Sequence, residues 1–129
     1  MRRKRPSKRI LKDKAWKAFS AYIRQKYADF SGFVACVTCG IKKNWKEMQA
    51  GHFIDGRMNA ILFEEDCVHP QCYSCNCMKH GNKVLYYKFM IKKYGQDLID
   101  KLIHLSKQTK LMTEEDYQNI YDKYKGYLA

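Results

Sequence analysis

The sequence predicts a small α+β domain in which a core stapled by cysteines is flanked by α-helices. Two Cys-x-x-Cys pairs, at positions 36–39 and 72–75, bracket the middle of the 129-residue chain. Between them, residues 48–54 alternate in the pattern of a half-buried strand. On either side of this middle part, apolar residues recur at three- and four-residue steps, which is typical of amphipathic helices. These observations divide the chain into four parts, residues 1–9, 10–32, 33–83 and 84–129.

The first two parts are predicted to be a tail and a helix. Residues 1–9 are too basic to pack into a core and are interpreted as a flexible tail. Residues 10–32 predict one amphipathic helix that ends at Ser31-Gly32. No apolar run approaches the ~20 residues of a membrane span, and no apolar segment of a signal peptide follows the basic tail. We therefore expect a cytoplasmic protein without a membrane anchor. The apolar stripe of the helix consists of Trp16, Phe19, Ile23 and Tyr27.

The charge of the chain indicates a polyanionic partner. Lys and Arg number 25 against 13 Asp and Glu, which gives a formal net charge of +12. Such an excess attracts nucleic acid, with an anionic membrane surface as the alternative. Contacts to phosphates bring affinity without sequence preference. The residues expected to make these contacts are Arg57, Lys79 and Lys83 in the core and Arg2, Arg3, Lys4 and Arg5 in the tail.

The C-terminal part, residues 84–129, predicts three helices. Tyr94-Gly95 separates the first two. The segment from Thr113 to Asp116 resembles an N-cap followed by an acidic first turn, so it starts the last helix. One side of this last helix is rich in tyrosine, which we interpret as a core or subunit contact, with base stacking as the alternative. That side carries Tyr117, Ile120, Tyr121, Tyr124 and Leu128.

The two cysteine pairs are the strongest chemical signal. Zn²⁺ binds four thiolates tetrahedrally, and a two-residue gap lets one tight turn present both sulfurs to the same ion. Gly40, directly after the first pair, suits such a turn because it tolerates a positive φ. In a reducing compartment these cysteines are expected to bind metal, with free thiols or disulfides as the alternative. Cys67 and Cys77 are interpreted as small buried fillers. The expected ligands of one structural Zn²⁺ are Cys36, Cys39, Cys72 and Cys75.

A strand histidine and an asparagine add possible chemistry to this scaffold. His52 lies on the predicted strand, and Asn76 directly follows the second cysteine pair. This order resembles that of the HNH, or ββα-metal, endonucleases, and the layout is similar to that of the endonuclease VII resolvases. The resemblance to the phage NinG/Rap recombination family is closer still. The matching features are the CxxCG knuckle, the AGHF stretch, the run DCVHPQC from Asp66 to Cys72, the Cys75-Asn76 pair and Gly81-Asn82.

The resemblance implies a treble-clef-like ββα-metal core over about residues 33–87 of a phage- or prophage-encoded protein. It implies an endonuclease acting in the bacterial host on branched DNA, such as Holliday junctions and D-loops. His52 would be the general base and Asn76 a ligand of a catalytic Mg²⁺ or Mn²⁺. The residue chemistry agrees, because histidine takes up a proton near neutral pH and an amide oxygen suits a hard cation. His69 matches a histidine of the NinG/Rap pattern and is the favoured further ligand, whereas His80 is expected on the helix face of Asn76 as a surface or phosphate contact.

Two departures from the HNH pattern keep alternatives open. Gly51 stands where many HNH enzymes carry a metal-ligating Asp or His, and Cys67 replaces their central Asn. The missing ligand must come from elsewhere, with Asp55 and Asp66 as candidates beside His69, or be absent. Asn76 would also serve as a helix N-cap without any metal.

The sequence therefore leaves several functions open beside the branched-DNA nuclease. One is a zinc-scaffolded DNA- or RNA-binding adaptor with an inactive site. Another is a zinc-stabilised protein-interaction module, and a third is an HNH nuclease that acts on linear duplex. Symmetric cutting of a four-way junction needs two active sites, so we expect a homodimer.

Overall fold

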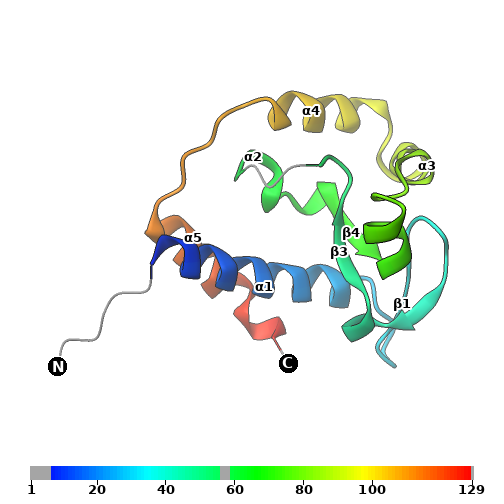
Figure 1. The fold of residues 1–129 in the computed structure, drawn as a ribbon, viewed down its shortest axis with the longest axis horizontal. Helices are drawn as coiled ribbons and strands as arrows, with labels where there is room; N and C mark the ends of the chain where they lie inside the picture. Colours follow the sequence, from blue (N-terminus) through cyan, green and yellow to red (C-terminus); the bar gives the residue numbers. More distant parts are fainter. Residues whose placement is uncertain (1–6, 56–58, 129) are drawn as a thin grey trace.

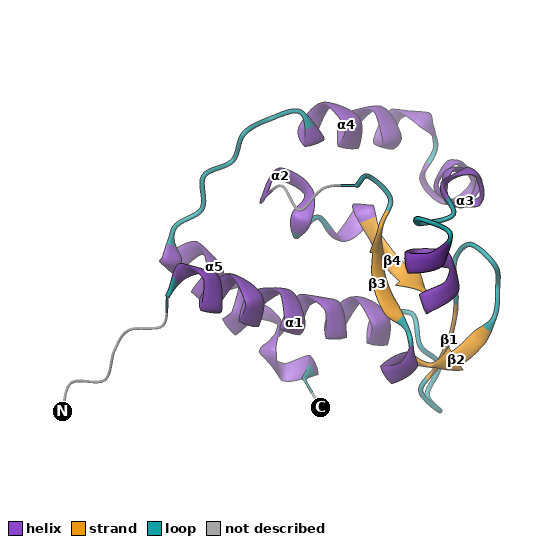
Figure 2. Ribbon diagram, viewed as in Figure 1, coloured by secondary structure: helices purple, strands orange, loops and turns teal. Residues whose placement is uncertain are grey.

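The fold is α+β, as the sequence predicts. The computed structural model describes residues 7–55 and 59–128, so the basic tail from Arg2 to Arg5 and Arg57 lie outside the described residues. Within these ranges, five α-helices surround two separate two-stranded antiparallel sheets. Figure 2 shows that both sheets lie at one end of the first helix.

Helix α1, Lys8–Lys26, is shorter at its C-terminal end than the sequence predicts. It begins where the Ser7 hydroxyl accepts a hydrogen bond from the Ile10 N–H, at 3.3 Å. Its central residues Phe19 and Ile23 are fully buried. The chain after the helix turns back through Gly32, whose φ of +88° explains a glycine there. α1 is thus the long element against which the strands and the last helix pack.

The two sheets carry the predicted motifs. Strand β1, Phe33–Ala35, pairs antiparallel with β2, Lys42–Asn44, and the first cysteine pair lies in their connection. Strand β3, Gln49–His52, pairs antiparallel with β4, Val68–Gln71, and we call this pair the β3–β4 ribbon. β3 is shorter than the predicted strand 48–54. The short helix α2, Asn59–Leu62, lies in the connection between β3 and β4.

The second cysteine pair leads into a short π-helical turn, Ser74–Met78. Three consecutive residues then adopt positive φ angles, His80 at 50°, Gly81 at +90° and Asn82 at 48°. This left-handed run ends the turn and reverses the chain before the next helix. The expectation that His80 shares a helix face with Asn76 is therefore wrong, because the helical turn ends before His80 is reached.

The three predicted C-terminal helices are present. Helices α3, Lys83–Tyr94, and α4, Gln96–Ser106, are separated at Gly95, and α5 spans Glu114–Tyr124. The N-cap signal before α5 is confirmed as a capping box between Thr113 and Asp116. α3 and α4 pack on each other, whereas α5 returns to run along α1 (Figure 1).

The buried residues that the structure describes form a main core, a smaller cluster around the cysteines and a third cluster where Leu11 and Ala15 of α1 meet Met112 and Tyr117. In the main core, Phe19 and Ile23 of α1 pack with Val68 of β4 and Tyr86 of α3. The second cluster contains three of the paired cysteines with Val34 and Met48. The β3–β4 ribbon links the main core to the cluster around the cysteines. Within the described ranges, none of the helices has the length and apolar character needed to cross a bilayer.

Candidate functional site

The four paired cysteines form one cluster that can hold a metal ion. Their four Sγ atoms all lie within 4.8 Å of one another. Thiolates bound tetrahedrally at about 2.3 Å from zinc place neighbouring sulfurs about 3.8 Å apart, and the Sγ atoms of Cys39 and Cys72 are 3.7 Å apart. The knuckle glycine Gly40 has the predicted positive φ, +81°. The cluster therefore fits the size and chemistry of a Zn²⁺ site.

Hydrogen-bond donors surround the sulfurs of this cluster. The Cys75 N–H points to Cys72 Sγ at 3.4 Å, and Asn82 Nδ2 lies 3.5 Å from Cys75 Sγ. The Thr38 hydroxyl lies 3.2 Å from Cys36 Sγ. Such donors stabilise thiolates and fix the orientation of metal ligands. Asn82, with its left-handed backbone, thus donates a hydrogen bond to the cysteine cluster.

The thiols of the cluster differ in their proton affinity. Burial would raise the pKa of Cys36, but hydrogen bonds from the Cys39 backbone and the Thr38 hydroxyl outweigh it and lower this pKa to about 6. Burial, together with the neighbouring thiols, raises the pKa of Cys39 to about 12. Thiols this close do not all ionise together at neutral pH, because their charges repel one another. A bound cation removes that conflict, which favours a metal in the cluster.

The two remaining cysteines lie outside the cluster and differ from each other. Cys67 is fully buried in the main core, as predicted. Cys77 is exposed, and its Sγ lies 3.2 Å from Gln49 Oε1. The interpretation of Cys77 as a buried filler is therefore wrong, because the π-helical turn presents it to solvent.

The imidazole of His52 is held in one orientation and one tautomer. Its Nε2 lies 3.1 Å from the Leu62 carbonyl oxygen, which can only accept a hydrogen bond, so Nε2 carries the proton. In the neutral ring the basic nitrogen is then Nδ1. The ring also stacks on Trp16 of α1, with centroids 5.1 Å apart and planes inclined by 18°. The predicted base thus faces α1 with a defined proton-accepting atom.

Asn76 lies on the opposite side of the ribbon, inside the π-helical turn. Its Nδ2 donates a hydrogen bond of 2.7 Å to Gln49 Oε1. Because the turn begins at Ser74, Asn76 is not its N-cap, and the capping alternative is wrong. The position of Asn76 is set by the cysteine cluster, since Asn76 directly follows Cys75.

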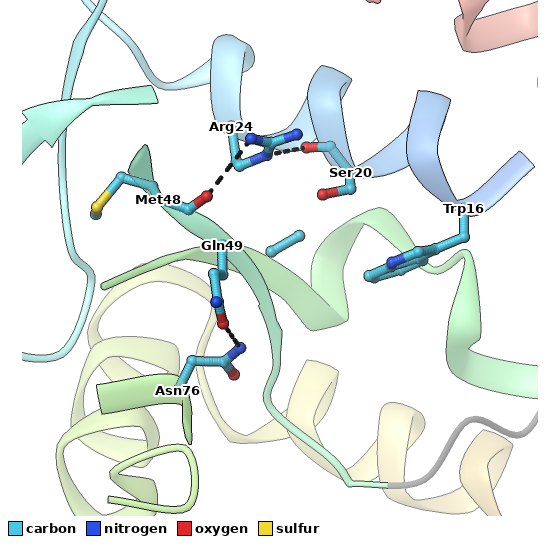
Figure 3. Close-up of a pocket in the computed structure, with 7 residues that line it drawn as sticks. Trp16, Ser20, Arg24, Met48, Gln49 and Asn76 are labelled. Carbon is cyan, nitrogen blue, oxygen red and sulfur yellow. Dashed lines mark hydrogen bonds between the residues drawn. The ribbon is translucent and has the colours of Figure 1, made fainter. Parts of the chain in front are cut away.

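An open pocket of about 330 Å³ lies between α1 and the π-helical turn, beside β3 (Figure 3). Asn76 lines one side of the pocket and Trp16, the stacking partner of His52, lines the other, so His52 is linked to the pocket through Trp16. The alternation along β3 explains the arrangement: Gln49 and Gly51 face the turn, and His52 faces α1. The remaining lining residues are Ser20, Arg24, Met48, Gln49 and Ala50.

Arg24 places a positive charge in this pocket. Its guanidinium donates to the carbonyl oxygens of Ser20, at 3.1 Å, and Trp45, at 3.3 Å, and stacks on the Trp45 ring at 5.2 Å. Burial lowers the pKa of Arg24, but arginine stays charged in proteins. No pattern in the sequence singles out Arg24, because it is one of several basic residues beside a helical stripe.

The structure does not bring His69 into this pocket. The side chain is fully buried, with Nδ1 3.0 Å from the Tyr86 hydroxyl and Nε2 2.8 Å from the Tyr94 hydroxyl. Burial, and then the charges of Lys93 and Lys26, lower the pKa of His69 to about 3. Both ring nitrogens are engaged, so this histidine braces β4 against α3.

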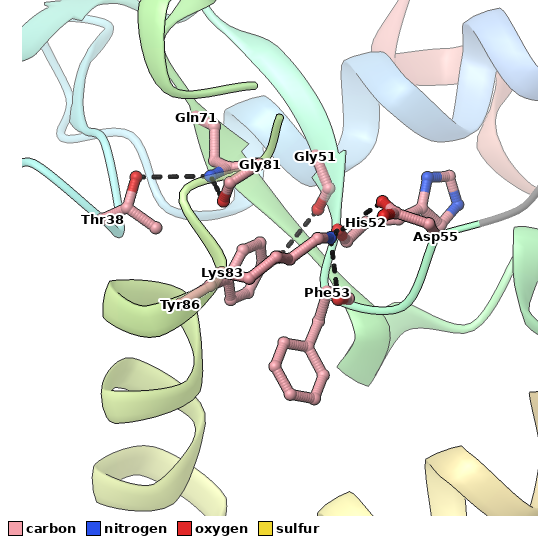
Figure 4. A network of polar contacts seen from close by, with 9 residues as sticks. All are labelled: Thr38, Gly51, His52, Phe53, Asp55, Gln71, Gly81, Lys83 and Tyr86. Carbon is pink, nitrogen blue, oxygen red and sulfur yellow. Dashed lines mark hydrogen bonds and ion pairs between the residues drawn. The ribbon is translucent and has the colours of Figure 1, made fainter. Parts of the chain in front are cut away.

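Lys83 lies among acceptors at the end of β3 (Figure 4). Its Nζ donates to the carbonyl oxygens of His52, at 2.7 Å, and Phe53, at 2.8 Å, and pairs with Asp55 at 2.9 Å. These contacts give Lys83 a bracing role, and its contact with DNA stays a prediction. They also engage Asp55, one of the candidate metal ligands. Lys79 is exposed, as a phosphate contact requires.

Comparison with known proteins identifies the family of this chain. The family model described as bacteriophage lambda NinG protein matches residues 2–129. The chain belongs to the NinG family. The ninG protein of Escherichia phage lambda is 32% identical over 89 residues, which cover 68% of this chain and 41% of that protein. The ninG protein of Salmonella phage P22 is 30% identical over 102 residues, or 78% of this chain and 48% of that protein. No solved structure gives a significant match.

The features that suggested the NinG family converge on the β3–β4 ribbon. The AGHF stretch supplies β3 and the DCVHPQC run supplies β4, while Gly81-Asn82 forms part of the left-handed run beside the cysteines. The matched region spans less than half the length of these NinG relatives. The structure thus describes the part of a NinG protein that contains the metal cluster and the pocket.

Proposed function

We propose that this chain is an HNH-type, metal-dependent endonuclease that hydrolyses phosphodiester bonds in branched recombination intermediates, such as Holliday junctions and D-loops. One observation carries the proposal. An amide side chain, Asn76, lines one side of a pocket, and Trp16, on which the His52 imidazole of the neighbouring strand stacks, lines the other. A nuclease of this class needs these two groups near each other but with separate tasks.

Zinc would serve as the scaffold of this site. β4 leads directly into Cys72, and the π-helical turn that carries Asn76 contains Cys75. An ion held by the four cysteines would therefore fix Asn76 relative to the β3–β4 ribbon without taking part in the reaction. With zinc bound, the ribbon and the π-helical turn would form a zinc-stapled ββα-metal core.

The chain's residues divide the chemistry between them. His52 Nδ1 would accept the proton of the attacking water, while the Leu62 carbonyl holds Nε2–H and keeps the ring in the required tautomer. The Asn76 amide oxygen would bind Mg²⁺ or Mn²⁺, which when present offsets negative charge on the phosphate and the leaving oxygen. Arg24 would hold a phosphate oxygen at the pocket rim.

DNA binding is supported by the charge of the chain. The net charge of +12 favours phosphate contacts by Lys79, Lys83 and Arg57, and by the tail from Arg2 to Arg5. Two cuts across a junction require two sites, so we propose a homodimer that acts in the cytoplasm of the bacterial host of a phage or prophage. The NinG relatives are longer than this chain, so the DNA substrate and the homodimer are proposed for this chain and are not taken over from those relatives.

Cleavage of a four-way junction, a fork and a linear duplex in Mg²⁺ or Mn²⁺ tests the proposal. We expect cutting of the branched substrates, and a loss of at least about 100-fold in His52→Ala, as for other general bases. His104→Ala is the matched control, because His104 is exposed on α4. Zinc content and thermal stability are measured for each variant. Undiminished cutting by His52→Ala would remove the general base from the proposal.

The second candidate is a zinc-scaffolded DNA-binding adaptor that does not cut. The observation in its favour is Gly51, which provides no metal ligand at the position before the histidine. Wild-type protein that binds the junction but leaves it intact in every divalent metal would support the adaptor. Preferential cutting of the linear duplex would instead indicate an HNH nuclease without selectivity for branches.

A further inference from the structure

The side-chain amide of Gln71 has a fixed orientation in the interior. Gln71 is the last residue of β4 and is fully buried. Its Nε2 donates to the Gly81 carbonyl oxygen at 2.8 Å and to the Thr38 hydroxyl at 3.3 Å (Figure 4). A carbonyl oxygen only accepts, so the amide nitrogen must be on this side. The amide oxygen Oε1 therefore points the other way.

Oε1 of Gln71 has no hydrogen-bond partner among the residues that the structure describes. Buried side-chain oxygens in folded proteins are nearly always hydrogen-bonded, and an exception calls for a bound water, an ion or a functional role. Gln71 therefore presents an oxygen that is fixed in place by its own nitrogen and is available to a ligand.

Gly51 makes the space into which this oxygen projects. A Cβ added at residue 51 would lie 1.9 Å from Gln71 Oε1 and 3.0 Å from Asn76 Oδ1. The two amide oxygens thus converge on the place where a side chain of residue 51 would begin. Asn76 is oriented for this by its Nδ2, which is held by Gln49. Glycine is required at residue 51 because the side chain of Gln71 occupies the space that a Cβ at this position would need.

We propose that Gln71 Oε1 and Asn76 Oδ1 are the protein ligands of a divalent cation site, and that Gln71 substitutes from β4 for the metal-ligating side chain that residue 51 lacks. Two neutral oxygens suit Mg²⁺ or Mn²⁺, which keep several waters and gain further ligands from phosphate. The role of the site in DNA cleavage rests on the proposed function, whereas cation binding by Gln71 is measurable without DNA.

The test moves the proposed ligand from residue 71 on β4 to residue 51 on β3. Mn²⁺ binding to the zinc-loaded protein is followed by electron paramagnetic resonance of free Mn²⁺. We expect Gln71→Ala to weaken binding at least tenfold. Adding Gly51→Asp to Gln71→Ala places a carboxylate in the vacated space and is expected to restore binding to the wild-type level or above. Gly51→Asp alone is expected to impair folding, since its Cβ meets the Gln71 amide.

A second variant separates a ligand from a purely structural residue. Gln71→Glu keeps the oxygen and adds a charge, but it loses the N–H groups that hold Gly81 and Thr38. A ligand role predicts tighter Mn²⁺ binding in Gln71→Glu and weaker binding in Gln71→Ala. A structural role predicts the same loss in both. Gln118→Ala on the exposed face of α5 is the matched control.

The outcomes distinguish this inference from the proposed function. Mn²⁺ binding that depends on Gln71, in a protein that cuts no DNA, would uphold the site and remove the nuclease. Cleavage that depends on Mn²⁺, with binding and cutting unchanged in Gln71→Ala, would overturn the site and leave the nuclease. Absence of Mn²⁺ binding by the wild-type protein would also overturn the site.

Discussion

His69 and Gln71 lie two residues apart on the same face of β4, and both are fully buried, yet their surroundings differ. His69 is held by two tyrosine hydroxyls of α3, and both of its nitrogens are engaged. Gln71 is held by Thr38 and Gly81 beside the cysteine cluster, and within the described part of the chain only its nitrogen has a partner. The comparison teaches that a buried polar residue with all partners satisfied fixes the fold, whereas one with an unpaired oxygen is available for binding.

The largest expected effect comes from removing the zinc ion that the four cysteines beside Gln71 would bind. Structural zinc contributes on the order of 10 kcal/mol to folding, comparable with the whole stability of a small domain. We expect Cys72→Ser, or a strong chelator, to unfold the β3–β4 ribbon and to abolish the binding of stoichiometric zinc. Circular dichroism and metal analysis provide the measurement.

Cys77→Ser is the control for this experiment, because Cys77 is exposed and lies outside the cluster. It should keep full zinc content and a melting temperature close to that of the wild type. Equal damage from the two substitutions would contradict the assignment of the cluster.

The next largest effect is expected from the substitution of His69 on β4. His69→Leu leaves the hydroxyls of Tyr86 and Tyr94 without one partner each, and we expect it to lower the free energy of unfolding by about 3 kcal/mol at pH 7. Urea unfolding of the zinc-loaded protein measures this loss.

Acid should narrow the difference between the wild type and His69→Leu. The pKa of His69 is about 3 in the folded state and 6.5 in the unfolded state, so below pH 6.5 the unfolded chain binds the extra proton. This contribution to stability is complete above pH 6.5 and falls by up to about 1.4 kcal/mol per pH unit as the pH drops towards 3. A difference between the two proteins that does not change between pH 7 and pH 5 would show that His69 is not held neutral.

The smallest effect is expected for the matched substitution Gln71→Leu. It removes the donor to Gly81, but it also removes a buried oxygen without a partner, and these two terms oppose each other. We expect a change of at most about 1 kcal/mol in the free energy of unfolding, in buffer free of Mg²⁺ and Mn²⁺. A loss as large as that of His69→Leu would make Gln71 a structural residue and would remove the contrast between the two ends of β4.

The sequence predicted the parts of this molecule that depend on local spacing. The two cysteines of each pair lie together because each pair sits in one tight turn, and the break at Gly95 and the N-cap Thr113 follow from single-residue preferences. The contacts of His69 and Gln71 depend on which residues face each other across the β3–β4 ribbon. No local pattern encodes that register.

The same limit explains why the proposed ligands of a divalent cation are harder to predict from the sequence than the cysteine cluster. His69 matches a histidine of the NinG/Rap pattern, which favours it as a ligand, but two tyrosines from a later helix engage it. Gln71 carried no signal of its own, because glutamine is neutral and lies next to a cysteine. Only the structure shows that the Gln71 side chain fills the space where a side chain of residue 51 would lie.

The return of α5 to α1 has a consequence for the order in which the chain acquires its structure. α1 is synthesised first, but one of its two packing surfaces is completed only by a helix that begins about a hundred residues later in the chain, at Glu114. The cysteine cluster and the β3–β4 ribbon lie between them and can close earlier, because their contacts are nearer in sequence. During synthesis, α1 would therefore dock on the β3–β4 ribbon and the cysteine cluster with its other flank still exposed to solvent, and α5 would cover that flank later.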